Sequence, residues 1–224
     1  MATQTVLITG AEGALGSVVR KRFATAGYQV IGTYHPGGTP PTSEDSATRF
    51  IKVDLANSAT VHQTISSLGD IDVLVHCAGG FRYAQVENTS DDDLDFLFNS
   101  NLRSSFLLLR ELLPSMKKRN FGRIVLISSK ATLQAPAGMS AYCAAKAGIN
   151  ALVSSAAEEV KAFDINVNAV MPTVIDTPAN RRDMPKANFA SWVTPNELAE
   201  IIFSLTQPFG KPVHGALIPI SGRI

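Results

Sequence analysis

The sequence has little cysteine and no excess of charge of either sign, and both shortages exclude classes of function. The two cysteines, Cys77 and Cys143, have neither the spacing of metal ligands nor that of a disulfide framework, so we expect two small core residues. The four histidines show no ligand spacing, and we predict no metal site. The 20 lysines and arginines nearly balance the 19 acidic residues and are scattered, which argues against nucleic acid or a membrane surface as a partner.

Long apolar runs are also absent. No stretch approaches the ~20 apolar residues that span a bilayer, and MATQTVLITG leads directly into an apolar strand, without a charged region and a cleavable apolar segment. We therefore expect a cytoplasmic protein. There is no internal repeat, and the 224 residues suit one domain, residues 1–224. A chain of this length would bury about 70% of its unfolded surface.

The sequence does contain a regular alternation of short runs rich in Val and Ile with longer amphipathic segments. The predicted strands are 5–10, 28–34, 49–55, 71–79, 122–129, 164–172 and 215–222, and the predicted helices are 14–26, 58–68, 91–118, 141–162 and 195–206. This order predicts an α/β fold: a single-domain, Rossmann-like, doubly wound parallel β-sheet of about seven strands with helices on both faces. Residues 35–49, rich in Pro, Gly and Ser, predict an exposed loop in place of a helix.

The turn between the first predicted strand and the first predicted helix carries three glycines. Gly10, Gly13 and Gly16 lie three residues apart in VLITGAEGALGS. In a dinucleotide-binding turn the first glycine permits the tight turn, the second lets the backbone approach a pyrophosphate, and the third lets the helix pack on the strand. The helix N-terminus offers free N–H groups to the anion. We interpret this segment as a phosphate-binding turn; the alternative is an ordinary strand-to-helix connection.

Further candidate residues fall at strand ends and on one helix. Asp54 follows the third predicted strand and the segment 77–80, CAGG, follows the fourth; ligands of open α/β sheets bind at such strand ends. Tyr142 and Lys146 are four residues apart and share one helix face, so a phenol and an ammonium group could reach the same reacting atom. Taken alone, such a pair also occurs by chance.

Together these motifs make the chain resemble the short-chain dehydrogenase/reductase family over nearly its whole length. The family's remaining motifs follow in the same order: an Asn-Ala-Gly-type turn at Ala78-Gly79, a helical asparagine at Asn101, a strand-end serine at Ser129, the Tyr-x-x-x-Lys pair, and a Pro-Gly-type turn at Pro172-Thr173. Thirteen residues separate Ser129 from Tyr142, the usual spacing in that family, which selects Ser129 over Ser128. The resemblance implies NAD or NADP as the cofactor and a small-molecule substrate.

The resemblance also implies a role for each catalytic residue. Tyr142 would transfer the proton, with its pKa lowered by the Lys146 ammonium group, which would also hold the nicotinamide ribose. Ser129 would bond the substrate oxygen, and Asn101 would position a water in a proton relay. Each residue also has a purely structural explanation, as a strand-end turn, a backbone-bonded helix residue or a solvated charge. The residues predicted to bind the cofactor are Gly10, Glu12, Gly13, Ala14, Leu15, Gly16, Tyr34, Asp54, Leu55, Ala78, Gly79, Gly80, Tyr142, Lys146, Pro172, Thr173, Val174 and Thr177.

Four features depart from the family pattern. The glycine spacing is Gly-x-x-Gly-x-x-Gly, His76-Cys77 replaces two asparagines, and Thr173 replaces a glycine. After the second strand, Tyr34-His35 provides neither an acidic residue for a ribose 2′-hydroxyl nor an arginine for a 2′-phosphate. Glu12 would repel a phosphate if its side chain faced it. The choice between NAD and NADP therefore stays open at this point.

A narrower resemblance, to the dihydropteridine reductase family, is specific in the second half of the chain. It rests on the segments GALGS, AGG, AGMSAYCAAKAG and VMPTVIDTPANRRDMPKANFASW. That family works without the strand-five serine and the helical asparagine, whereas this chain has both. We therefore favour hydride transfer between a nicotinamide and a small carbonyl or alcohol, with a quinonoid dihydropterin as the alternative substrate. A dinucleotide-binding sensor or scaffold without activity is the alternative of another class.

The segment 174–195 is too long and too interrupted by proline for a simple strand-to-helix connection, and it predicts a substrate lid. Trp192 either covers the pocket or, with Phe189, anchors the loop to the core. Three basic residues of the segment form a solvated charge cluster or meet an anionic substrate: Arg181, Arg182 and Lys186.

The sequence also predicts assembly. The helices near 95–117 and 141–162 carry surfaces rich in Leu and Ala, and in the resembling family these two helices pair across a two-fold axis. We expect a homodimer or homotetramer. Small residues would permit close approach of the helices or would face the sheet: Ala144, Ala145 and Ala151.

Overall fold

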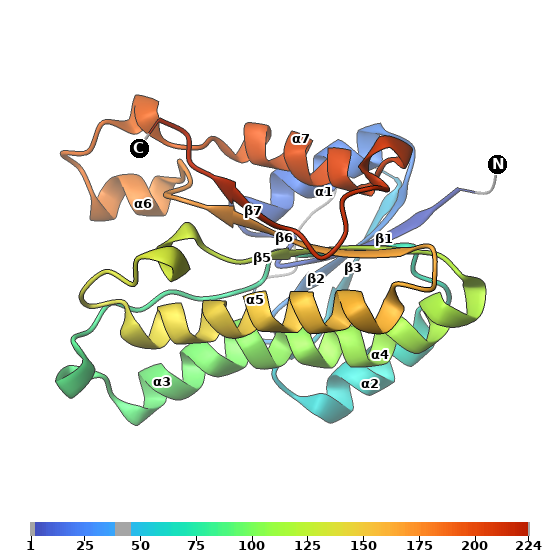
Figure 1. Ribbon diagram of the computed structural model, residues 1–224, viewed down its shortest axis with the longest axis horizontal. Coiled ribbons are helices and arrows are strands. Elements are labelled where there is room, and N and C mark those ends of the chain that lie inside the picture. Colours follow the sequence, from blue (N-terminus) through green and yellow to red (C-terminus); the bar gives the residue numbers. More distant parts are fainter. Residues whose placement is uncertain (1–2, 39–45, 224) are drawn as a thin grey trace.

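Seven parallel strands form one sheet in the computed structural model, which describes residues 3–38 and 46–223 (Figure 1). The strands are β1 (Thr5–Thr9), β2 (Gln29–Tyr34), β3 (Thr48–Lys52), β4 (Val73–His76), β5 (Gly122–Ile127), β6 (Ile165–Pro172) and β7 (Leu217–Ile220). Their order is β3-β2-β1-β4-β5-β6-β7. The chain runs outward from β1 to β3 and returns to place β4 on the other side of β1, so the topological switch point lies between β1 and β4. The predicted doubly wound sheet is confirmed.

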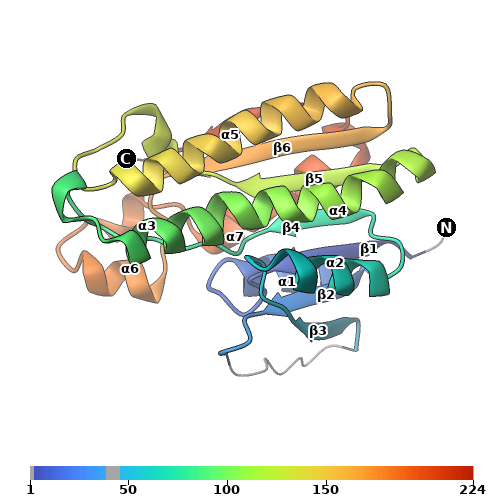
Figure 2. The same ribbon diagram turned by 90° about the horizontal axis from the view of Figure 1, so that it is seen from below.

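Helices cover both faces of the sheet (Figures 1 and 2). On one face lie α1 (Gly16–Thr25) and α7 (Pro195–Thr206), which contact each other. On the other face α2 (Ser58–Ser67) packs against α4 (Ser104–Arg119), which packs against α5 (Ser140–Val160). Two shorter helices, α3 (Asp91–Leu97) and α6 (Pro178–Asp183), lie beyond the carboxyl ends of the strands. Within the described residues, none of the helices is long and apolar enough to cross a membrane.

Alternate residues of each strand enter two separate hydrophobic cores. On β1, Leu7 belongs to the core beneath α4 and α5, whereas Val6 and Ile8 belong to the core beneath α1 and α7. A strand buried on both faces reads as a continuous apolar run, because successive side chains point to opposite sides. This is why the strands could be located from runs of Val and Ile.

The predicted helix 91–118 is one continuous helical segment made of three parts. α3 continues into a π-helical turn, Phe98–Arg103, and then into α4. A π-helical turn inside an α-helix often marks a functional position, and Asn101 lies within this one, fully buried. The extra residue of the turn is not visible in the hydrophobic pattern.

The connection after β2 agrees with a loop where it is described. Residues 35–38 and 46–47 are turn or irregular structure, and 39–45 lie outside the described residues. The last two residues of the predicted loop, 48–49, belong to β3. Of the two predicted core cysteines, Cys143 is buried, but Cys77 is only half-buried by its exposed area and lines a cavity. That part of the expectation was wrong, because β4 ends at His76 and the chain then leaves the sheet.

Candidate active site

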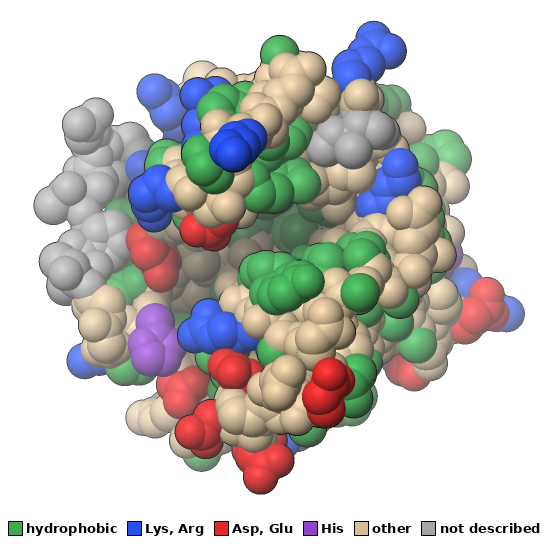
Figure 3. All heavy atoms as spheres, turned by 90° about the vertical axis from the view of Figure 1, so that its left-hand side faces the viewer, with side chains coloured by type: hydrophobic (Ala, Val, Ile, Leu, Met, Phe, Trp, Pro, Cys, Tyr) green, Lys and Arg blue, Asp and Glu red, His purple; other side chains and the backbone are tan. Residues whose placement is uncertain are grey.

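The candidate residues gather beyond the carboxyl ends of β1, β4, β5 and β6, on the left in Figure 1. Figure 3 faces this end of the molecule and shows a hollowed surface with hydrophobic side chains beside the hollow. In open parallel sheets this edge, at the switch point, is where ligands bind.

The glycine turn between β1 and α1 is shaped by two glycines that have no room for a side chain. Gly10 has φ +61, and a Cβ there would lie 2.9 Å from the backbone nitrogen of Ala78. A Cβ on Gly16 would overlap the carbonyl oxygen of Gly10. Gly13 is exposed, and its N–H donates to the Gly10 carbonyl at 3.0 Å. The turn therefore presents bare backbone at the N-terminus of α1, where free N–H groups and the helix dipole favour an anion.

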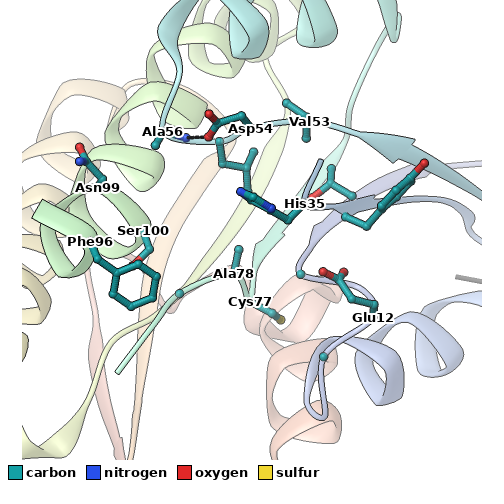
Figure 4. Close-up of a pocket in the computed structure, with 16 residues that line it drawn as sticks. Glu12, His35, Val53, Asp54, Ala56, Cys77, Ala78, Phe96, Asn99 and Ser100 are labelled. Carbon is teal, nitrogen blue, oxygen red and sulfur yellow. Dashed lines mark hydrogen bonds between the residues drawn. The ribbon is translucent and has the colours of Figure 1, made fainter. Parts of the chain in front are cut away.

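A cavity of about 390 Å³ opens beside this turn (Figure 4). It is lined by residues of the glycine turn and of the ends of β2, β3 and β4, together with three residues of the α3 region. The lining residues are Gly10, Glu12, Gly13, Thr33, Tyr34, His35, Val53, Asp54, Leu55, Ala56, Cys77, Ala78, Gly79, Phe96, Asn99 and Ser100. Cofactor pockets are commonly concave sites of this size at a switch point.

The cavity brings together eight of the residues predicted to bind a cofactor: Gly10, Glu12, Gly13, Tyr34, Asp54, Leu55, Ala78 and Gly79. Other predicted residues do not line it: Ala14, Leu15, Gly16, Gly80, Tyr142, Lys146, Pro172, Thr173, Val174 and Thr177. Sequence reasoning missed the contributions of His35, Phe96 and Ser100. His35 directly follows Tyr34 and could have been inferred from the strand end, whereas the α3 residues reach the cavity through tertiary packing alone.

His76, which stands where the family has an asparagine, joins β4 to β1 and α4. The Thr9 hydroxyl lies 2.6 Å from Nδ1 and the Ser104 hydroxyl 3.0 Å from Nε2. The Ser104 hydroxyl donates to the Ser100 carbonyl at 2.8 Å, so it accepts from Nε2–H, and Nδ1 accepts from the Thr9 hydroxyl. Burial, and then the charge of Lys146, lower the pKa of His76 from 6.5 to about 3.

Asn101 uses its side chain to hold the turn after β4. Its Nδ2 donates to the carbonyls of Leu97 at 2.8 Å and Gly80 at 3.0 Å, and its Oδ1 accepts from the Gly80 N–H at 3.3 Å. The side chain is therefore committed to backbone groups, as the structural explanation predicted. Any contact of Asn101 with a relay water would have to use its main chain.

Ser129, Tyr142 and Lys146 come together between β5 and α5. The Ser129 hydroxyl is close enough to Tyr142 to lower its pKa, and the Lys146 ammonium lies 5.9 Å from the centre of the Tyr142 ring. Lys146 Nζ donates to the Ile127 carbonyl at 2.7 Å. A Cβ on Gly79, which lines the cavity, would lie 3.4 Å from this nitrogen, so Lys146 stands directly behind the cavity wall.

The pKa shifts differ from the expectation. Burial raises the pKa of Tyr142 above 10, and the hydrogen bond from Ser129 offsets only part of this rise. The Tyr142 pKa is thus raised, against the predicted lowering by Lys146, because desolvation of the buried phenol is the largest cause. Burial likewise lowers the pKa of Lys146 from 10.5 to about 8. Surrounding protein atoms also raise the pKa of Cys77 from 9.0 to about 12 by desolvating its thiolate, although the residue as a whole is only half-buried.

Asn150, which the sequence did not indicate, fixes the position of the Ser129 turn relative to α5. Its Oδ1 accepts from the Ser128 hydroxyl at 2.6 Å, and its Nδ2 donates to the Thr132 hydroxyl at 3.1 Å. Thr132 in turn donates to the Ser129 carbonyl at 2.8 Å. Because Asn150 lies one helical turn after Lys146, one helix carries Tyr142 and Lys146 and also holds the serine that faces them.

An apolar wall stands next to Tyr142. The ring of Phe81 packs edge-on against Tyr142, with 5.0 Å between ring centres, and remains 47% exposed. An exposed apolar side chain close to a reactive group favours a substrate with an apolar part.

The segment 174–195 is an ordered excursion whose two ends meet. The Val193 N–H donates to the Val174 carbonyl at 3.2 Å, and the Asp176 N–H to the Val193 carbonyl at 2.8 Å. Trp192 is buried, 6% exposed, and packs against Phe189, so it anchors the segment and does not cover the cavity.

Side chains in and next to this segment form an ion pair and hydrogen bonds within the protein. Arg181 forms a bidentate pair with Asp176 at 2.6 and 2.7 Å, whereas Arg182 and Lys186 are exposed. Thr173 donates to the Ser221 carbonyl, and the Thr177 hydroxyl caps α6. These bonds explain how the chain turns after β6.

A glycine turn at the switch point of a parallel sheet, beside a neighbouring serine and tyrosine and a buried lysine, is the arrangement of a nicotinamide-dependent oxidoreductase. The comparisons agree. The family model described as short chain dehydrogenase matches residues 4–188. The chain therefore belongs to the short-chain dehydrogenase family and is an NAD(P)-dependent oxidoreductase.

Individual relatives share the whole length of the chain. It is 32% identical to an acetoacetyl-CoA reductase from Acinetobacter sp. (strain RA3849), over 97% of this chain and 96% of that protein. It is 30% identical to a 3-oxoacyl-(acyl-carrier-protein) reductase from Thermotoga maritima, with the same coverage of 97% and 96%. A solved structure described as a short chain dehydrogenase/reductase family protein superposes with a TM-score of 0.88 at 25% identity, over 98% of this chain and 96% of that one.

Proposed function

We propose that the chain reduces a small ketone, of the 3-oxoacyl kind, to the corresponding alcohol with NADH or NADPH. The observation that carries this proposal is the juxtaposition of Ser129 and Tyr142 with Lys146 buried behind the cavity wall. The names of two relatives, an acetoacetyl-CoA reductase and a 3-oxoacyl-(acyl-carrier-protein) reductase, support a ketone as the acceptor. The apolar wall at Phe81 suits the carbon chain next to such a ketone.

The chain's residues then divide the work of one proton transfer. The bound cofactor supplies a hydride to the carbonyl carbon, and the carbonyl oxygen takes the electron pair of the broken π bond. The Ser129 hydroxyl stabilises the charge that develops on this oxygen. Tyr142 donates the proton that completes the alcohol, and its raised pKa keeps the phenol protonated at neutral pH. Lys146, charged below about pH 8, stabilises the phenolate left behind.

The cofactor would lie along the cavity. The turn from Gly10 to Gly16 would bind the pyrophosphate at the N-terminus of α1. Asp54 and the turn Ala78–Gly80 would flank the adenosine side and the middle of the cofactor, and Lys146 would hold the nicotinamide ribose. We further propose that the segment 174–195 closes over the substrate, that the protein is a homo-oligomer, and that it works in the cytoplasm.

A substrate panel tests the reaction. The purified chain is assayed with acetoacetyl-CoA, a simple 3-oxoester and quinonoid dihydropterin, each with NADH and with NADPH, by the loss of reduced-nicotinamide absorbance. Ketone reduction is expected. Ser129→Ala should lower its turnover by about 10²–10³-fold, because one donor to the developing oxyanion is lost, and Tyr142→Phe should lower it at least as much.

The alternative function is reduction of a quinonoid dihydropterin. The exposed Phe81 ring beside Tyr142 favours it, since a flat conjugated ring could pack there. A dihydropterin delocalises the charge of the incoming hydride and depends less on Ser129, so Ser129→Ala should leave its reduction within about tenfold. Rapid dihydropterin turnover in the parent, little changed by Ser129→Ala and without reduction of any ketone, would replace the proposed function with this one.

A further inference from the structure

One charged side chain of the glycine turn faces the cavity. Figure 4 shows Glu12 at the edge of the cavity that also contains His35, with the Glu12 carboxylate directed into it. The turn and the end of β2 are held together, because the Ala11 N–H donates to the Thr33 carbonyl at 3.2 Å. A pyrophosphate bound at the N-terminus of α1 brings the adenosine ribose to this junction of the turn and β2.

β2 ends without an acidic residue, and Glu12 of the glycine turn supplies a carboxylate in its place. In a dinucleotide site an acidic side chain at this junction accepts a hydrogen bond from the ribose 2′-hydroxyl. Tyr34 ends β2 and cannot do so as a carboxylate would. The Glu12 carboxylate faces the same cavity and carries the required charge.

His35 adds an N–H donor. The Gly37 N–H donates to His35 Nδ1 at 3.1 Å, so the ring proton lies on Nε2. A ribose 2′-hydroxyl can both donate and accept, which matches one carboxylate and one N–H. A 2′-phosphate only accepts and carries up to two negative charges, which a carboxylate repels.

The cations needed to offset this repulsion do not line the cavity. Over residues 3–38 and 46–223, the cavity lining contains Glu12 and Asp54 but neither lysine nor arginine. Arg103 contacts a cavity residue from outside, since its Nε donates to the Ala56 carbonyl at 2.9 Å. It therefore serves as the matched control.

From this arrangement we infer that Glu12 is a specificity-determining residue that makes the enzyme select NADH over NADPH. The inference rests on the proposed function, because it needs the cofactor in this cavity. Glu12 is exposed, so its repulsion of the 2′-phosphate is screened by solvent and salt. We expect NADH to bind about tenfold more tightly than NADPH at low salt, a difference of ~1.4 kcal/mol.

Fluorescence titrations with NADH and NADPH test the inference in the parent chain, Glu12→Gln and Arg103→Gln. Glu12→Gln keeps the size of the side chain and removes its charge, so NADPH should bind more tightly while NADH changes by less than about threefold. Arg103→Gln should leave the ratio of the two dissociation constants unchanged. The advantage of NADH in the parent should shrink as salt is raised.

The outcomes distinguish failure of the role of Glu12 from failure of the proposed function. A parent that prefers NADPH, a ratio unaffected by Glu12→Gln, or loss of NADPH binding in Arg103→Gln would each overturn the role of Glu12 and leave the reductase standing. A parent that binds neither dinucleotide would overturn the proposed function as well. If Glu12→Gln failed to fold by circular dichroism, the ratio measured in the parent and in Arg103→Gln would still decide the preference.

Discussion

His76 is held neutral inside the protein by two hydroxyl partners. Protonation would make Nδ1 a donor facing Thr9, whose hydroxyl proton already points at it, and would place a second charge near Lys146. The unfolded chain takes up a proton on this histidine below about pH 6.5, whereas the folded chain does so only near pH 3. The stability contributed by the neutral ring is therefore fully present above pH 6.5 and is lost as the pH falls toward 3.

This histidine should give the unfolding free energy a measurable pH dependence. Between pH 6 and pH 4 it contributes a slope of up to about 1.4 kcal/mol per pH unit. His76→Gln should flatten the curve by that amount, whether or not the variant is less stable at pH 7. Urea unfolding at several pH values measures it. Equal slopes in His76→Gln and the parent would contradict the assignment.

Individual site residues differ in how far the sequence could predict them. Tyr142, Lys146 and Ser129 were predicted because their spacing reflects one helix face and one strand end, both local features. The direction of the Tyr142 pKa shift was predicted wrongly, since it depends on how much of the chain covers the phenol. Asn150 and Phe81 were not predicted at all, because their importance comes from hydrogen bonds and ring contacts between elements.

At the scale of elements, the turn between β1 and α1 contains glycines with different tasks. A side chain at Gly16 would meet the Gly10 carbonyl, whereas Gly13 is exposed and a Cβ there would lie 3.2 Å from the same oxygen. A glycine at position 16 is needed for packing the helix on the strand, and a glycine at position 13 for access of a ligand to the backbone.

Substitutions at these two glycines should therefore affect different properties, ligand affinity at Gly13 and stability at Gly16. Gly13→Asp should keep the fold and weaken dinucleotide binding by at least ~100-fold, because it adds bulk and negative charge where the pyrophosphate binds. Gly16→Ala should lower the melting temperature, because the turn must open to fit the methyl group. Calorimetric titration and thermal melts distinguish them. Unchanged dinucleotide affinity in Gly13→Asp would show that the turn is not the binding site.

Most elements were predictable because they are buried on a regular period. The strands of the parallel sheet show as apolar runs, and α7 was predicted at its observed residues, 195–206; in the structure Thr194 caps its start. The π-helical turn at 98–103 and the short α6 were not predicted. The first is an extra backbone residue that leaves the amphipathic pattern nearly intact, and the second is fixed by the Thr177 cap and the meeting of the segment's ends.

At the scale of the whole molecule, α4 and α5 form an outer layer next to each other (Figure 2). Of the alanines considered for helix pairing, Ala144 and Ala151 are exposed, whereas Ala145 is buried against the core. Phe106 on α4 is 51% exposed. A large apolar ring and small side chains on adjacent exposed helices allow a second copy to approach closely.

This surface predicts a homodimer or homotetramer. α5 has 21 residues and is therefore about 30 Å long, so two antiparallel copies with α4 could bury the ~800 Å² per partner that stable interfaces need. Light scattering at micromolar concentration should give a dimer or tetramer mass for the parent and half of it or less for Phe106→Asp and Ala151→Asp, because a carboxylate would be buried unpaired. Val86→Asp, at an apolar residue that is 71% exposed outside both helices, is the matched control and should keep the parent mass. A monomeric parent, or variants that assemble like the parent, would show that these helices are not the interface.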